Sequence, residues 1–314
     1  MPVWLVRSLR RLGGILLVVW GAATATFLAV RLVPGDPVDV MLGIHAQVSD
    51  HLKDAIRADL GLDRPLGEQY LLYLGRLVTG DLGQSYQLRK PVVAVIGEQL
   101  GATAQLTAVA FAAAIVLAVV GALLARGPLA RSVASTVELV VASAPTFWTG
   151  MLLLSVLGFQ LGWFPVLATS RPEAIVLPAL TLALPVAGIL SQVLREGIEA
   201  AEGRPFLTSV RARGAGPARV LLRHTLRHGT VVAVPLGGYL LGSLLGGAVL
   251  VETVFARPGI GRVTLRAILD RDMPVVLGVV VLSAVVFSLV NLVVDVLVGR
   301  LDPRSRLLDP AVSR

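Results

Sequence analysis

Long apolar stretches, separated by charged segments, recur along this chain of 314 residues. A helix needs about 20 apolar residues to cross a hydrocarbon layer of about 30 Å, and six stretches reach roughly that length. They cover residues 12–30, 101–125, 133–157, 174–194, 229–251 and 273–294. The pattern predicts an all-α membrane protein with six transmembrane helices.

Proline and glycine inside these stretches indicate where helices bend and where they approach one another. Proline kinks a helix, and small residues at four-residue spacing let a second helix come close. The internal prolines are Pro145, Pro178, Pro185 and Pro235. The glycines with this spacing are Gly238, Gly242 and Gly246. We expect bends at the prolines and a packing face at the glycines, with a pore wall as the alternative for the latter.

Arginine and lysine are distributed unevenly among the connections, which predicts the orientation of the helices. Basic residues concentrate in short cytoplasmic loops, and segment 195–228 holds seven arginines against three glutamates. The amino end, segment 126–132 and the carboxyl tail are basic as well. Both termini and the segments 126–132 and 195–228 are therefore expected in the cytoplasm, and the long loop 31–100 is expected outside.

The first stretch has an alternative interpretation as a cleaved signal peptide. Basic residues precede it, and Ala23-Thr24-Ala25 resembles a cleavage site. Its uncharged run of nineteen residues exceeds the roughly 7–15 residues of a signal-peptide core. A retained transmembrane helix is therefore favoured.

Composition agrees with a membrane protein, since 55% of residues are apolar, 15% are charged and the mean hydropathy is +0.79. A soluble domain needs far more surface charge. The distribution of the net charge of +8 follows the predicted membrane orientation, so we expect no nucleic-acid partner. The chain has no cysteine, which excludes disulfides, thiolate metal sites and cysteine nucleophiles.

No nucleotide or metal site is apparent in the sequence. The two lysines, Lys53 and Lys90, lie outside any G-x-x-x-x-G-K-[ST] motif, so ATP, if it powers the protein, binds to another chain. His224 and His228 have the spacing of a helical zinc pair, but Thr225 replaces the glutamate of the metalloprotease signature and arginines surround both. We therefore expect no metal site and no cofactor bound by this chain.

Two acids lie near the cytoplasmic ends of predicted spans: Glu138 about one turn inside the span 133–157, and Asp295 at the end of the span 273–294. Ionisable groups within a membrane often serve a function, but a role in helix packing or snorkelling is the favoured interpretation here. No catalytic pair accompanies them, so an intramembrane enzyme is a weaker alternative.

The segment 206–228 has the pattern of a helical hairpin. A short helix ends at Gly214-Ala215-Gly216, and a second begins at Pro217, because proline fits the first turn of a helix. On the second helix Arg219, Arg223 and Arg227 form one stripe with an apolar flank, as in a helix at a membrane surface. The preceding helix and the glycine turn favour docking into a partner's groove.

The hairpin carries an aromatic residue, Phe206, then Arg211-Ala212-Arg213-Gly214, and then His224. This order resembles the EAA loop of binding-protein-dependent ATP-binding-cassette importer permeases, in the branch that carries peptides. Val210 and His228 stand where that family usually has alanine and asparagine.

Short blocks elsewhere in the chain resemble further motifs of the same family. They are Pro34-Gly35-Asp36-Pro37, Leu60-Gly61-Leu62-Asp63-Arg64-Pro65, Gly80-Asp81-Leu82-Gly83, Val251-Glu252-Thr253-Val254-Phe255, Pro258-Gly259-Ile260-Gly261, Arg271-Asp272-Met273-Pro274 and Leu301-Asp302-Pro303-Arg304. Their order along nearly the whole chain is typical of the first permease of dipeptide, oligopeptide and nickel importers.

The resemblance implies the all-α, MetI-like fold of a type I importer and a set of partners. These are a second homologous permease, two ATPase subunits or one fused ATPase that bind ATP and Mg, an extracytoplasmic substrate-binding protein and membrane lipid. The implied function is the inward movement of dipeptides or oligopeptides across the inner membrane by alternating access, without catalysis by this chain. Nickel or another small solute is the alternative cargo, and an ATPase-independent channel is the alternative class.

The family's coupling role is carried over to the matching hairpin residues. These are Phe206, Arg211, Ala212, Arg213, Gly214, Arg219 and His224. The arginines are expected to contact the ATPase, although retention of positive charge in the cytoplasm also explains them, and Gly214 is expected to make the turn. Polar residues within the spans are candidates for the translocation path, and they are Gln105, Thr149, Gln192, Ser243 and Asn291.

The expected organisation has three parts. Residues 1–100 form the first span and an external loop that faces the binding protein, 101–299 form a five-helix core that includes the hairpin 196–228, and 300–314 form a cytoplasmic tail.

Overall fold

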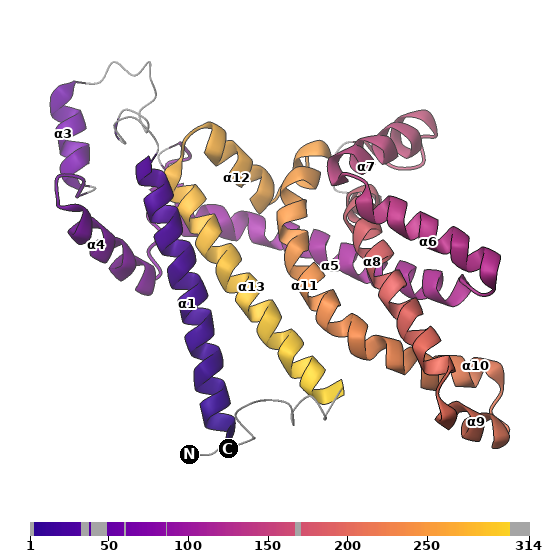
Figure 1. Ribbon diagram of the computed structural model, residues 1–314. Helices are drawn as coiled ribbons and strands as arrows, with labels where there is room; N and C mark the ends of the chain where they lie inside the picture. The colour runs from indigo at the N-terminus through magenta and orange to yellow at the C-terminus, as the bar shows by residue number, and fades with distance from the viewer. Residues whose placement is uncertain are drawn as a thin grey trace.

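The computed structural model of the chain describes residues 3–32, 38, 49–59, 61–85, 87–166 and 171–301, which are largely helical (Figure 1). The first part holds α1 (Val3–Leu32), α3 (Asp50–Asp59), α4 (Leu66–Val78) and the short antiparallel strands β1 (Gln84–Ser85) and β2 (Lys90–Pro91). The middle part holds α5 (Val92–Leu124), α6 (Pro128–Ser143), α7 (Thr146–Leu153), the π-helix η1 (Leu154–Gln160), the 3₁₀ turn η2 (Pro172–Ile175) and α8 (Val176–Glu202). The last part holds α9 (Pro205–Ala212), α10 (Pro217–Arg219), the π-helix η3 (Val220–Thr225), α11 (Leu226–Val254), α12 (Ile260–Leu269) and α13 (Met273–Leu301).

Three features of the sequence lie outside the described residues. They are the block 34–37, the greater part of the block 301–304, and the side chain of Asp295.

Among the described residues, five segments are long and apolar enough to cross a membrane as single helical stretches. They are Arg11–Ala29, Val92–Leu124, Pro172–Glu202, Pro217–Val254 and Met273–Val294. Three of them are longer than the predicted apolar stretches, namely Val92–Leu124, Pro172–Glu202 and Pro217–Val254. In these, the helix continues past the length needed to cross the hydrocarbon layer.

The predicted third span, 133–157, is not one continuous helix. Pro128–Ser143 and Thr146–Gln160 meet at an angle of 104°. Ala144 has the extended backbone (φ −68°, ψ 131°) that a following proline imposes, and Pro145 then caps the start of α7. The predicted bend at Pro145 is confirmed, and the number of spans is six only when this bent pair is counted as one. Helices α8 and α11 continue through Pro185 and Pro235.

Helix α8 lies at the centre of the bundle and packs chiefly against α5, α11 and α6. The face of α5 toward it is built from alanines at four-residue spacing: Ala110, Ala114, Ala118 and Ala122. These fill the same buried cluster as Leu177, Leu182, Leu190 and Leu194 of α8. Small side chains let helix backbones approach closely in an apolar solvent, so the alanine stripe fixes how α8 sits on α5.

The glycine stripe of α11 forms a packing face over two of its three positions. A methyl group on Gly238 would lie 2.1 Å from Val294 of α13, and one on Gly242 would lie 2.5 Å from Phe287 of the same helix. Gly246 has nothing within 4 Å. The predicted close approach is therefore confirmed for Gly238 and Gly242, and it does not extend to Gly246.

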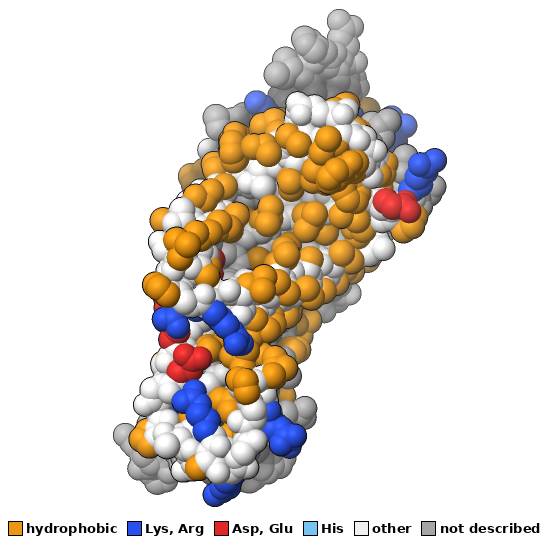
Figure 2. Space-filling view, turned by 90° about the vertical axis from the view of Figure 1, so that its right-hand side faces the viewer, with side chains coloured by type: hydrophobic (Ala, Val, Ile, Leu, Met, Phe, Trp, Pro, Cys, Tyr) orange, Lys and Arg blue, Asp and Glu red, His pale blue; other side chains and the backbone are white. Residues whose placement is uncertain are grey.

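Apolar side chains cover much of the outer surface. Figure 2 shows the side of α6, α7 and the hairpin, where orange side chains fill the middle of the face and charged ones appear near its two ends. The exposed apolar residues of α6 and α7 include Val133, Val137, Val140, Phe147 and Trp148. At the opposite edge α1 packs along α13 (Figure 1). A surface of this kind is stable against lipid or protein, and not against water.

Aromatic residues attach α4 to the carboxyl-terminal half of α1. The ring of Phe27 lies 5.4 Å from that of Tyr70 and 5.6 Å from that of Tyr73. The Tyr70 hydroxyl lies 2.6 Å from Thr24 Oγ1, within hydrogen-bonding distance. The Tyr73 hydroxyl is buried without a hydrogen-bond partner among the described residues, and burial raises the pKa of Tyr73 to about 12, with a contribution from neighbouring Tyr70.

The two tyrosines are expected to respond differently to loss of their hydroxyl groups. Tyr70→Phe removes a hydrogen bond and lowers the free energy of unfolding by about 1 kcal/mol, whereas Tyr73→Phe removes an unpaired polar atom and leaves stability unchanged or slightly raised. Thermal unfolding of both variants in the same detergent measures the difference. An equal loss in the two variants would contradict this assignment of partners.

Candidate functional site

The predicted helical hairpin is present between α8 and α11 and projects from one end of the bundle, called here the hairpin end (Figure 1). Its first arm is α9, and its turn spans Arg213 to Gly216. Gly214 has a φ of +80°, the left-handed conformation in which glycine carries no steric penalty. The N–H of Ala215 donates to Val210 O at 3.4 Å, which closes the end of the helix as in a Schellman motif. The turn at Gly214 is thus confirmed.

The two arms of the hairpin are held together by a small buried contact. Leu207 on α9 and Val220 on η3 are buried, and the ring of Phe206 lies 5.2 Å from that of His228 at the start of α11. Of the two histidines at zinc-pair spacing, His228 therefore packs against an aromatic ring. The second arm begins with α10 but continues as the π-helix η3, which the sequence did not predict.

Most of the residues predicted to couple the chain to an ATPase lie exposed on the hairpin. The exposed ones are Arg211, Ala212, Arg213, Gly214 and Arg219, while Phe206 and His224 are half-buried. The structure thus separates the set in two. Phe206 holds α9 against α11, and the exposed arginines present positive charge to whatever meets the tip.

At the base of the hairpin α8 and α11 touch through two glycines that sequence reasoning did not single out. A methyl group on Gly197 would lie 2.5 Å from Gly229 Cα, and one on Gly229 would lie 2.9 Å from Leu194 O. Both distances are far below van der Waals contact. The hairpin therefore emerges from a crossing in which neither helix tolerates a side chain at the contact.

A buried acid organises the opposite end of the bundle. Glu252, on the last turn of α11, is 0% exposed. Its Oε1 accepts a hydrogen bond of 2.5 Å from Thr103 Oγ1 on α5, and its Oε2 accepts one of 3.1 Å from the Arg262 backbone N–H. The Ile260 N–H donates to Thr103 Oγ1 at 2.9 Å. Glu252 and Thr103 together cap the first turn of α12.

This cap explains two of the blocks noted in the sequence. Added methyl groups would lie 2.1 Å from the Glu252 carboxylate at Gly259 and 2.4 Å from Val249 Cα at Gly261. The glutamate of the V-E-x-V-F block and the glycines of the P-G-x-G block therefore form one structure. Neither block alone predicts the contact, because the hydroxyl that completes it is on α5.

A second buried acid, Asp272, ties the β-hairpin to the start of α13. Ser85 Oγ donates to Asp272 and accepts from the Leu88 N–H at 3.0 Å. The Asp272 N–H donates to Ala267 O at 2.7 Å, which fixes the turn between α12 and α13. The R-D-M-P block thus joins the segment that follows the G-D-L-G block.

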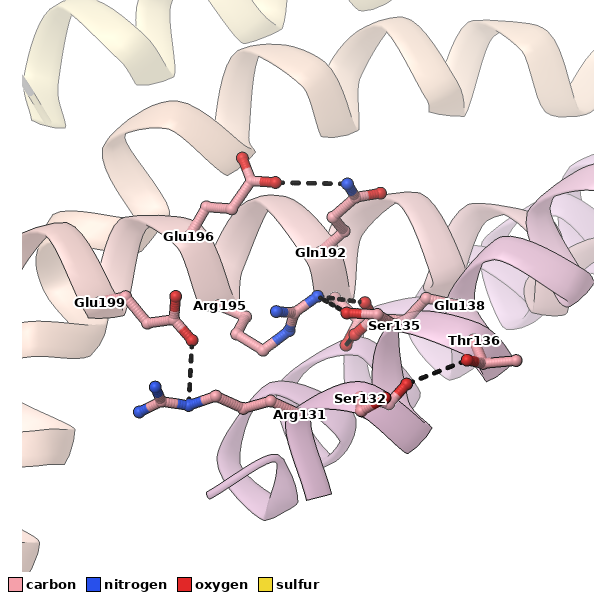
Figure 3. Close-up of polar contacts among 10 residues, drawn as sticks. Arg131, Ser132, Ser135, Thr136, Glu138, Gln192, Arg195, Glu196 and Glu199 are labelled. Carbon is pink, nitrogen blue, oxygen red and sulfur yellow. Dashed lines mark hydrogen bonds and ion pairs between the residues drawn. The ribbon is translucent and has the colours of Figure 1, made fainter. Parts of the chain in front are cut away.

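The intramembrane acid Glu138 forms an ion pair inside the bundle. Its Oε2 lies 2.7 Å from Arg195 Nη2 on α8 (Figure 3). Glu138 is therefore a helix-packing residue and does not snorkel to the surface. Its partner is separated from it by 57 positions in the sequence, and it was not predicted.

The candidates for the translocation path lie on five different helices. Thr149, Ser243 and Asn291 each donate to a backbone carbonyl three or four positions earlier in the chain, and Gln192 donates to Glu196 one turn further along α8. Gln105 accepts from Arg257 Nη2 at 3.3 Å and so contacts the segment before α12. These hydrogen bonds join no two of the five candidates, whose role in a path stays a prediction.

Comparisons with known proteins give consistent results over most of the chain. Residues 114–307 match the model of the family "Binding-protein-dependent transport system inner membrane component", and residues 4–107 match that of its N-terminal region. The chain is 35% identical to the di/tripeptide transport system permease protein DppB of Pseudomonas aeruginosa (strain UCBPP-PA14) over 95% of this chain and 97% of the relative. It is 32% identical to the glutathione transport system permease protein GsiC of Escherichia coli (strain K12) over 95% of this chain and 98% of the relative.

The fold also has a counterpart among solved structures. An inward-facing structure of the MetNI methionine ABC transporter superposes with a TM-score of 0.51 at 16% sequence identity, covering 67% of this chain and 97% of that chain. This likeness shows a MetI-type arrangement of helices. The chain belongs to the binding-protein-dependent transport system inner membrane components, the permease subunits of ATP-binding-cassette importers, in which separate subunits hydrolyse ATP.

Proposed function

We propose that this permease pairs with a second, homologous permease to form the channel of an importer for di- or oligopeptides. Two ATPase subunits, or one fused ATPase, drive it from the cytoplasm, and a binding protein delivers cargo from outside. Peptide cargo is supported by the two relatives, whose names describe di/tripeptide and glutathione transport. Nickel or another small solute is the second candidate, because the residues that the structure describes offer no contact that distinguishes these cargoes from peptides.

The observation that carries the mechanism is the exposed arginine tip of the α9–α10 hairpin. Arg211, Arg213 and Arg219 are exposed around a turn fixed by Gly214, and the base of the hairpin is clamped between α8 and α11. A rigid, basic projection of this kind fits a groove on an ATPase. Closure of the ATP-bound dimer then moves the tip, and the clamped base passes the motion to α8 and α11.

The proposed orientation places both termini and the hairpin in the cytoplasm. Support comes from the excess of arginine in segment 195–228. In this orientation the cap around Glu252 and the β-hairpin at Asp272 lie on the outer side, where the loop 31–100 and α12 are available to the binding protein.

ATPase activity of the importer in lipid tests the proposal. The permease is co-expressed with the ATPases and second permease encoded beside it, and the binding protein is added empty or loaded with di- or tripeptides. Stimulation by loaded binding protein supports a peptide importer. An assembled ATPase that ignores peptides but responds to nickel or another solute moves the cargo to that class. Failure of this chain to assemble with any ATPase would overturn the coupling role.

Replacing Gly214 by valine is expected to leave membrane insertion intact and to uncouple ATP hydrolysis from transport. A β-branched residue at a φ of +80° is strained by about 1–2 kcal/mol or more, so the turn reopens and the tip loses its shape. The measurement is peptide uptake per ATP hydrolysed in proteoliposomes.

Gly216→Val is the matched control for this change. Gly216 lies two positions away, has an ordinary φ of −67° and has nothing within 4 Å. We expect it to transport normally. Normal uptake by the Gly214→Val variant would show that the shape of the turn is not needed for coupling.

A further inference from the structure

Helices α6 and α8 are joined by a row of polar contacts, which we call the polar ladder. It consists of Arg131, Ser135 and Glu138 on α6 and Ser191, Arg195 and Glu199 on α8. Within each helix these residues are three or four positions apart, so they share one face. Their numbers rise on α6 as they fall on α8, since the two helices are antiparallel (Figure 3).

The inner contacts of the ladder centre on the buried residues Glu138, Ser191 and Arg195, while Ser135 is exposed. Arg195 Nη2 donates to Glu138 Oε2 at 2.7 Å and to Ser135 Oγ at 3.0 Å. Ser191 Oγ donates to the other carboxylate oxygen of Glu138 at 2.7 Å. The side chains of Glu138 and Arg195 are 7% and 11% exposed. Both oxygens of the acid are therefore held by α8.

The outer rung lies at the hairpin end and is more open. Arg131 Nε lies 3.2 Å from Glu199 Oε1, and the two side chains are 46% and 37% exposed. At the inner end of the ladder the backbones themselves meet, because a methyl group on Gly188 would lie 2.7 Å from Glu138 O. The two helices are thus fastened along about three turns.

The contact between α8 and α6 is polar, whereas the other main contacts of α8 are apolar. Against α5 and α11 the helix packs through apolar side chains, chiefly alanine and leucine, and through the close glycine contact between Gly197 and Gly229. A charge inside the bundle loses its partner when the helices slide, and an unpaired buried charge is costly. The ladder therefore fixes the register of α6 on α8 through specific partners.

The ladder also lies on the same helix segment that leads into the hairpin. Helix α8 runs from Ser191 to Glu202 without interruption and passes into α9 over two residues. The clamp between Gly197 and Gly229 lies within the same turns. Displacement of α9 thus acts first on the segment that Glu138 and Arg195 hold.

We propose that the polar ladder makes α6 and the hairpin-end half of α8 a single lever, so that movement of the hairpin carries α6 with it. Glu138 and Arg195 are then positioning residues for transport, acting through helix α8 and not on the cargo. The inference rests on the proposed coupling role of the hairpin. Because α6 meets the segment of α7 and η1 at an angle of 104°, α6 can move with the hairpin without carrying α7 and η1 along its own axis.

Distances between spin labels test the lever in the unmodified ladder. The chain has no cysteine and adds no background label of its own. Val137→Cys on α6, Ser209→Cys on α9 and Leu16→Cys on α1, all at exposed positions, provide the label pairs once any reactive cysteines of the partner subunits are replaced. The complete importer in lipid nanodiscs is measured without nucleotide and after trapping with ADP and vanadate. We expect the α9–α1 distance to change and the α6–α9 distance to stay the same.

The two possible failures give different results in this measurement. If α9 moves relative to α1 but α6 stays in place, the lever is refuted and the coupling role of the hairpin stands. If α9 does not move relative to α1 in an importer that hydrolyses ATP, the proposed coupling role fails, and the lever fails with it.

Neutralising the buried pair tests the role of its charges. In Glu138→Gln, peptide imported per ATP hydrolysed is expected to fall about tenfold, the size of a typical coupling between sites, while ATP hydrolysis continues. The single variant leaves Arg195 as an unpaired buried charge and should lower thermal stability. The double variant Glu138→Gln/Arg195→Gln has no such charge, so its thermal stability should be higher than that of the single variant while its coupling stays low. Normal coupling in the double variant would overturn the proposal.

A matched control is Thr136 on α6, whose exposed hydroxyl donates to Ser132 O of the same helix at 3.0 Å and makes no hydrogen bond to α8 (Figure 3). Thr136→Val should leave peptide import per ATP unchanged. An equal fall in this variant would mean that any lost polar contact on α6 uncouples the importer, and the lever would be refuted. If the double variant does not assemble, the spin-label distances decide the question without it.

Discussion

Replacing Glu252 by alanine is expected to lower the free energy of unfolding by about 3 kcal/mol, because it leaves buried donors unpaired at a cost of about 1–3 kcal/mol each. The carboxylate is fully buried and accepts from Thr103 Oγ1 and from the Arg262 N–H. Without it the first turn of α12 loses its cap, and a cavity remains between α11 and α12. We expect α12 to detach from α5 while the rest of the bundle stays folded.

The measurement is the thermal unfolding midpoint in detergent, together with protease sensitivity of the segment 255–272. Glu252→Gln should lower the free energy of unfolding by about half as much as the alanine variant. Its amide oxygen still accepts one hydrogen bond, but its NH₂ group faces another donor. Gly246→Ala on the same helix is the control, because nothing lies within 4 Å of that position. Unchanged stability of the alanine variant would show that the cap does not hold α12.

Replacing Gly197 by valine is expected to abolish transport and to reduce assembly with the ATPase. The new Cβ atom would lie 2.5 Å from Gly229 Cα, so α8 and α11 must separate by roughly 1 Å or more to reach contact at about 3.5–4.0 Å. Overpacking of this kind costs typically 1–3 kcal/mol. The displacement occurs at the base of the hairpin and moves the whole tip away from its partner.

Co-purification of the tagged ATPase with this chain measures assembly, and uptake in proteoliposomes measures transport. Gly203→Val at the end of the same helix is the control, because Gly203 has nothing within 4 Å and an ordinary helical backbone. The control should assemble normally. Wild-type assembly of the Gly197 variant would show that the crossing tolerates a side chain, contrary to the close contact described above.

The helices were predictable from the sequence because a membrane imposes length and apolar character on each span. The break in the third span was predictable only in part. Pro145 marks where the helix bends, but the angle of 104° depends on how α7 and α6 each pack against α8 and α11, and this is not encoded near the proline. The turn at Gly214 was predictable because its cause is local.

The buried polar contacts were not predictable, because their partners are distant in the sequence. Glu138 stands out as an acid in an apolar stretch, and an arginine partner was conceivable, but many arginines are available in segment 195–228. Thr103 gives no signal of its own, although it completes the cap of Glu252 over a separation of 149 positions. Gly197 also gives no signal in the sequence, since its lack of a side chain matters only because α8 and α11 cross at this position.

The π-helical turn η3 (Val220–Thr225) has a consequence for the direction in which the hairpin points. A π-turn holds one residue more than an α-turn, and each residue of an α-helix advances the chain by about 100° around its axis. The extra residue thus sets the rotational phase between the hairpin and α11. Shortening this turn by a single residue would preserve a helix there but swing the arginine tip to another side of the axis. The direction in which the hairpin points is therefore set by the number of residues in η3, independently of which residues they are.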